Sequence, residues 1–114
     1  MSDLLKEIKK ADSKRELQEV QVPEWGVTVW LKQLTVGERD SFEAEAYAMK
    51  ENGLIKDIRS KFLARCLCDK DGKPLCKNYQ ELTTLSSQPM ERLFDIAQNY
   101  NKLTNEDVEE LAKN

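Results

Sequence analysis

The sequence predicts a small single α+β domain, mainly α-helical, in which one β-hairpin packs against several helices. Three observations predict this class. The chain has 114 residues, enough for one domain with a modest core. Apolar and polar residues alternate within 17–34 on both sides of a turn, as paired strands do. Over 88–102 the apolar residues recur every three or four positions, which is the helical period.

The first expected element is a short amphipathic helix over residues 2–11. Leu4, Leu5 and Ile8 share one face of it, and lysines surround them. Because a helix this short is marginal in water, its apolar face needs a cover, either the domain itself or a partner. We expect one domain over 1–114, with mobile ends at 1–14 and 103–114.

The expected hairpin pairs a strand over 17–22 with one over 27–34, joined by Pro23-Glu24-Trp25-Gly26. A lone hairpin is barely stable, so one of its faces must pack on helices or on another subunit. Trp25 falls in the turn, and Trp30 falls on the face opposite the alternating valines. Two interpretations stand for each tryptophan: cover for the domain's own core, or a large anchor in an interface.

Helices dominate the rest of the chain. Thr35 and Glu38 form a capping-box pattern at the start of one, and Pro89 suits the first turn of another. The expected helices run over 35–51, 54–67, 78–85 and 88–102, with a last one beginning after Thr104. The predicted core is Val27, Val29, Phe42, Ile58, Phe62, Leu93 and Phe94.

Residues suited to catalysis or metal binding are few. The chain has no histidine, which removes the usual base near neutral pH and the commonest metal ligand. A structural zinc needs four ligands in paired spacing, so we expect the three thiols to be small buried hydrophobes: Cys66, Cys68 and Cys76. Asp69-Lys70-Asp71-Gly72 predicts a turn, because a calcium loop would need glycine and an acid where Pro74 and Gln80 stand. We predict no enzyme, no cofactor and no metal.

Charge and hydropathy exclude several classes of binding partner. The net charge is −3 and the pI about 5.1, which gives no field to gather nucleic acid or an anionic membrane. The apolar runs are too short to span a bilayer. An odd number of cysteines without a secretory signal predicts a reducing cytoplasm. Contact with other proteins remains as the expected function.

The order of the segments resembles one known family. The resemblance lies in Trp25 to Leu31 (WGVTVWL), Leu34 to Glu43 (LTVGERDSFE), Ala64 to Gly72 (ARCLCDKDG), Leu85 to Phe94 (LSSQPMERLF) and Leu103 to Glu109 (LTNEDVE). Together these segments look like the tail assembly chaperones of long-tailed, non-contractile phages.

The resemblance implies a non-catalytic chaperone that binds the tape-measure protein and the tail tube protein. It also implies self-association, action in the host cytoplasm and absence from the mature virion. The residues proposed for partner binding are Trp25, Trp30, Leu4, Leu5 and Ile8.

Two other functions are alternatives for this sequence. One is a minor structural tail or connector protein, which would be found in purified particles. The other is a small DNA-binding regulator that uses the final helices, which the acidic C-terminal stretch disfavours.

The family also makes a longer form by programmed ribosomal frameshifting. Ala112-Lys113-Asn114 can be encoded GCA AAA AAC, which contains the slippery string A AAA AAC. We therefore expect a fraction of ribosomes to shift at the codons of Lys113 and Asn114.

Overall fold

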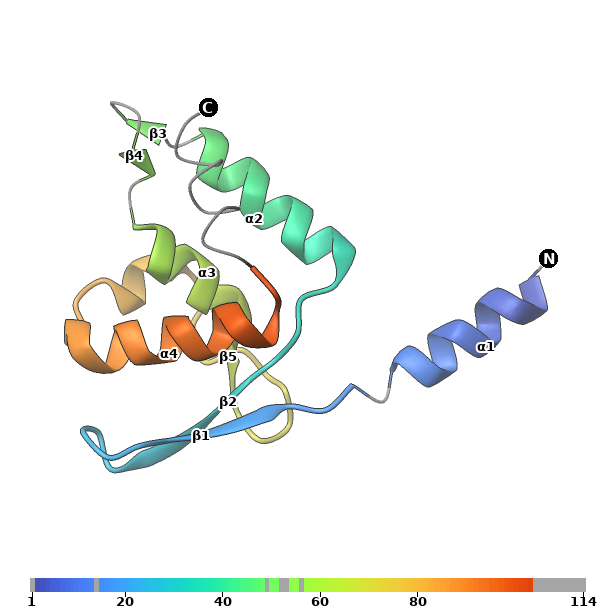
Figure 1. The fold of residues 1–114 in the computed structure, drawn as a ribbon, viewed down its shortest axis with the longest axis horizontal. Helices are drawn as coiled ribbons and strands as arrows, with labels where there is room; N and C mark the ends of the chain where they lie inside the picture. Colours follow the sequence, from blue (N-terminus) through green and yellow to red (C-terminus); the bar gives the residue numbers. More distant parts are fainter. Residues whose placement is uncertain (1, 14, 49, 52–53, 56, 104–114) are drawn as a thin grey trace.

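The structure is a computed structural model that describes residues 2–13, 15–48, 50–51, 54–55 and 57–103. Its elements in chain order are α1 (Ser2–Asp12), β1 (Gln18–Val22), β2 (Val27–Leu31), α2 (Val36–Ala48), β3 (Lys50–Glu51), β4 (Leu54–Ile55), α3 (Ile58–Cys66), β5 (Leu67–Cys68), the 3-10 helix η1 (Tyr79–Leu82) and α4 (Ser87–Tyr100). The fold class is the predicted one. In Figure 1, α2, α3 and α4 gather above the β1–β2 hairpin, and α1 extends away from them.

The hairpin is antiparallel, and β5 adds a third strand beside β2 in the order β1-β2-β5. Val20 pairs with Val29, and Leu31 pairs with Leu67 of β5. These side chains are buried under the helices, and the alternation that predicted the hairpin is confirmed. Strand β5 was not predicted, because a two-residue strand carries no period.

The core centres on three phenylalanines from three helices. Phe62 of α3 meets Phe42 of α2 with ring centroids 5.0 Å apart, and Phe94 of α4 with centroids 5.8 Å apart. Both pairs are edge-to-face, the arrangement that the ring quadrupole favours. Phe62 thus joins α2, α3 and α4 at one point.

Two members of the predicted core differ from expectation. Val27 is 49% exposed, so its assignment to the core was wrong. It starts β2 next to the hairpin turn, and its cross-strand partner Val22, rather than Val27 itself, is the fully buried member of that pair. Ile58 is half-buried and packs against the edge of the core. The other five predicted core residues are buried.

The boundaries around Asn52-Gly53 were predicted wrongly. Helix α2 ends at Ala48 rather than near residue 51, and α3 begins at Ile58 rather than at 54. Between them, β3 pairs antiparallel with β4, so Lys50 lies opposite Ile55. The pairing of these two short strands overrode the helical pattern expected over 50–55.

The predicted capping box and the predicted turn at Asp69–Gly72 are both confirmed. The Thr35 amide donates to Glu38 Oε1 at 2.9 Å, and the Glu38 amide donates to Thr35 Oγ1 at 3.1 Å, which completes the capping box of α2. The Gly72 amide donates to the Asp69 carbonyl at 3.0 Å and closes the predicted turn. The helix expected near 78–85 is the shorter η1. The helix expected after Thr104 lies outside the described residues.

Candidate protein-interaction surfaces

Helix α1 presents an uncovered apolar face. Leu4, Leu5 and Ile8 are 67%, 52% and 54% exposed. The C-terminal end of the helix is held locally, by Ser13 Oγ donating to the Lys10 carbonyl at 2.7 Å and by an Arg15–Asp12 ion pair at 2.6 Å. The helix is thus well formed, while its apolar residues remain open to a partner.

The hairpin turn is fixed against α4. The Arg92 guanidinium makes two contacts with the Glu24 carboxylate, at 2.6 and 2.7 Å. Its hydrogen bonds lower the pKa of Glu24 from 4.5 to about 2. Gly26 takes φ +66°, the left-handed conformation that glycine adopts without strain. Trp25, between them, is half-buried and packs against the core.

Trp30 lies on the face of β2 opposite Val29 and Leu31, as predicted. It pairs with Glu19 on one side and Cys68 on the other, and Cys68 Sγ donates to its carbonyl at 3.4 Å. The indole is half-buried. Its service as an interface anchor stays a prediction, as does that of Trp25.

The five predicted partner-binding residues do not form one surface. Leu4, Leu5 and Ile8 are together on α1. The hairpin turn with Trp25 lies at the opposite end of the long axis of the molecule (Figure 1). A partner that contacted both would have to run along the whole domain, or two copies would have to contribute.

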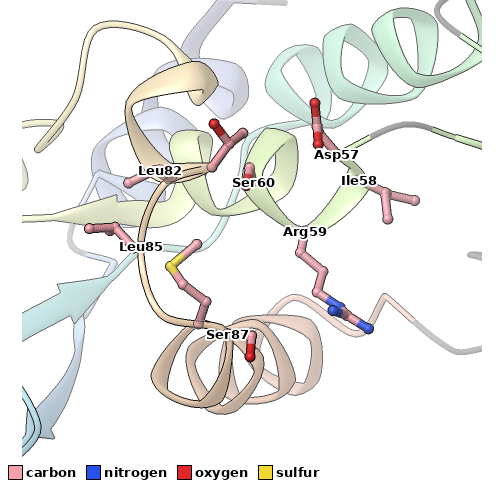
Figure 2. A pocket seen from close by; sticks show the side chains of 9 residues that line it. Asp57, Ile58, Arg59, Ser60, Leu82, Leu85 and Ser87 are labelled. Carbon is pink, nitrogen blue, oxygen red and sulfur yellow. The ribbon is translucent and has the colours of Figure 1, made fainter.

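A third surface was missed from the sequence. A hollow of about 360 Å³ lies between the start of α3, the end of η1 and the start of α4. We call it the α3–α4 pocket (Figure 2), and it is lined by Asp57, Ile58, Arg59, Ser60, Leu82, Thr83, Leu85, Ser87 and Met90. Leu82 and Met90 are buried in its floor, whereas Leu85 is 40% exposed. The sequence carries no local signal for this pocket, because its lining residues at 57–60 and 82–90 are far apart along the chain.

The polar groups of the α3–α4 pocket are incompletely matched. Ser60 is only 8% exposed, yet its hydroxyl forms no hydrogen bond within the described part of the chain. Asp57 is the N-cap residue before α3, at φ +56°, and its side chain makes no cap bond and no ion pair with any residue of that part. Arg59 is paired with Glu91 at 3.2 Å. Asp57 is partly exposed, so water can satisfy its carboxylate, whereas the Ser60 side chain is nearly buried.

Cys66 and Cys68 are buried as predicted, whereas Cys76 is only partly buried, so the prediction was wrong for that residue. Burial raises the pKa of the Cys66 thiol to about 12, and burial also raises the pKa of Cys68 and Cys76. Such thiols stay protonated at neutral pH and are poor nucleophiles and metal ligands. Among the described residues, no three metal-binding side chains converge. Nor does any helix in that part have the length and apolarity to cross a membrane.

The comparisons with known proteins give a fold match. Neither a family model nor a curated protein sequence matches the chain. Among solved structures, the bacteriophage HK97 tail assembly chaperone superposes with a TM-score of 0.61. The chain has the fold of that chaperone. The match covers 92% of this chain and 97% of the other at 22% sequence identity.

This match takes in nearly the whole length of both chains. At such identity the likeness defines the fold. The resemblance to tail assembly chaperones noted in five segments of the sequence is therefore matched by the three-dimensional arrangement.

Proposed function

We propose that this chain is a phage tail assembly chaperone that acts through reversible contacts with the tape-measure protein and the tail tube protein. The observation that carries the proposal is the fold shared with the HK97 chaperone over 92% of the chain. The uncovered apolar face of α1 supports it independently, because such faces mark sites of protein contact.

The physical need for such a protein is plain. A tape-measure chain is long and helical, and its apolar stripes are unpaired until the tube closes round it. Many copies of a small domain, each bound modestly, would cover these stripes strongly in sum and still be released. Self-association of the copies along the partner belongs to this proposal.

Co-expression with the tape-measure gene tests the proposal. We expect the tape-measure protein to move from the insoluble to the soluble fraction and to be recovered with this chain. Ile8→Asp should lower the recovery about tenfold, which corresponds to about 1.4 kcal/mol. Leu75→Asp is the matched control, because Leu75 is also an exposed apolar residue (48%) but lies outside α1 and the α3–α4 pocket. A tape-measure protein that stays insoluble beside abundant wild-type chain would contradict the proposal.

The proposed location is the host cytoplasm, with the chain absent from mature virions. Mass spectrometry of purified particles tests this, since a stoichiometric amount there would instead indicate a structural tail protein.

We also propose that translation shifts frame at the codons of Lys113 and Asn114. A gene that uses AAG or AAT codons there, without an overlapping downstream frame, would remove that part.

A further inference from the structure

The α3–α4 pocket contains a buried hydroxyl that has no partner in the part of the chain that the structure describes. Ser60, in the first turn of α3, is 8% exposed and lines the hollow. Its hydroxyl makes no hydrogen bond to any described residue. Folded proteins rarely leave a buried polar group unpaired, because the group has lost its water. A group that enters the hollow and bonds to Ser60 would replace that water.

The floor of the same pocket is apolar. Leu82 and Met90 are each 6% exposed and lie below the more open Leu85. The hollow of about 360 Å³ is near the lower end of the range for ligand pockets, so it has room for one or two side chains. An occupant therefore needs a slender aliphatic body as well as a polar tip.

The charges around the pocket favour a positive tip. Its charged lining residues are Asp57 and Arg59. Arg59 is neutralised by Glu91 of α4 at 3.2 Å, whereas Asp57 makes neither a cap bond nor an ion pair with any described residue. In the view of Figure 2, Ser60 lies between Leu82 and Asp57. A cation that reached Ser60 would therefore approach a carboxylate that is otherwise left to water.

We propose that the α3–α4 pocket binds a lysine side chain presented by an amphipathic helix of a partner protein. The methylene stem lies on Leu82 and Met90, and the ammonium donates to the Ser60 hydroxyl and the Asp57 carboxylate. A leucine one turn away on the partner helix covers Leu85. This inference rests on the proposed function, to which it adds the chemistry of one contact. Its test uses synthetic peptides, so its failure would leave the recovery of tape-measure protein unaffected.

Two labelled peptides test the lysine contact by fluorescence anisotropy with the purified full chain. Both are alanine-rich helices, with leucine and lysine four positions apart in the first and norleucine in place of that lysine in the second. Norleucine keeps the aliphatic stem and removes the charge, so the lysine peptide should bind about tenfold more tightly. Leu85→Asn should weaken binding of the lysine peptide about fivefold, whereas the matched control Leu75→Asn should leave it unchanged, since Leu75 is exposed outside the pocket. Circular dichroism checks that both variants fold.

Ser60→Ala should change two measurements in opposite directions. It should weaken binding of the lysine peptide about three- to tenfold, yet leave the melting temperature of the free chain unchanged or higher, because it removes an unpaired buried hydroxyl. Asp57→Asn tolerates the left-handed backbone and should weaken binding about two- to fivefold.

Three results would overturn the proposal. Equal affinity for the two peptides would show that the pocket does not select a cation. A lower melting temperature for Ser60→Ala would show that the hydroxyl is already satisfied in the free chain. Tighter peptide binding by Ile8→Asp would show that α1, from the same chain or from a second copy, is the occupant.

Discussion

Asn101 ends α4 and links it to the segment that leaves the sheet. Its Oδ1 accepts from the Leu34 amide at 2.7 Å. Its Nδ2 donates to the Lys32 carbonyl at 3.2 Å and to the Ala97 carbonyl at 3.0 Å. The residues on either side of the connection are more than 60 positions apart in the sequence, so this one amide closes a large loop of the chain. We take Asn101→Ala as the principal test of how the fold is held.

The expected loss follows from these bonds. Three hydrogen bonds of ordinary length contribute about 1 kcal/mol each, and the half-buried Leu34 amide would be left without its partner. We therefore expect Asn101→Ala to lower the free energy of unfolding by about 3–4 kcal/mol. For a chain of this length the melting temperature should fall by about 10–15 °C.

Urea denaturation followed by tryptophan fluorescence measures the change. Asn99→Ala is the matched control, because Asn99 lies on the exposed side of the same helix, and it should change stability by less than about 0.5 kcal/mol. Asn101→Asp should also destabilise, since it sets a carboxylate oxygen against the carbonyls of Lys32 and Ala97. A loss below about 1 kcal/mol for Asn101→Ala, or one equal to that of Asn99→Ala, would refute the assignment.

Three further predictions follow from the same structure. Phe62→Ala should lower the free energy of unfolding, measured by urea denaturation, by about 3–5 kcal/mol, because it empties the centre of the aromatic cluster. A loss under about 2 kcal/mol would mean that the core collapses around the gap. The Glu24 carboxyl should titrate near pH 2 by NMR, and Arg92→Met should return it towards 4.5. Because the pKa of Glu24 is lower in the folded state, the stabilisation by this ion pair is complete above about pH 4.5 and is lost as the pH falls through 2. If the pKa of Glu24 did not change in Arg92→Met, the ion pair would not be the cause of the lowered pKa. Thr35→Ala should lower the free energy of unfolding by about 1 kcal/mol, because the cap of α2 is lost, whereas Thr35→Ser keeps the hydroxyl and should keep most of this stability. Equal losses in the two variants would exclude the capping bond as the source.

Elements with a strong local signal were predicted well. The alternation around Val20 and Val29 specified the hairpin and its buried face, and the spacing of Met90, Leu93 and Ala97 specified α4. The Thr35–Glu38 box gave the start of α2 to the residue. In each case the stabilising groups lie within a few positions of one another, so the sequence records the interaction directly.

Elements that are very short, and features that depend on distant partners, were missed. The strands β3, β4 and β5 have two residues each, which is too short for an alternating pattern to be visible in the sequence. The α3–α4 pocket combines Ile58, Leu82 and Met90 from three separate elements. The anchoring role of Asn101 likewise depends on Leu34 and Lys32 lying beside the end of α4.

The sequence alone determined the fold class, the hairpin, the main helices and the amphipathic character of α1, because each rests on short-range periodicity and capping. Only the tertiary structure decided that Val27 lies outside the core, that α1 and the hairpin turn occupy opposite ends, and that α3 and α4 frame a pocket. The physical reason is that burial and neighbourhood depend on how the elements pack, and packing joins residues whose distance along the chain carries no pattern.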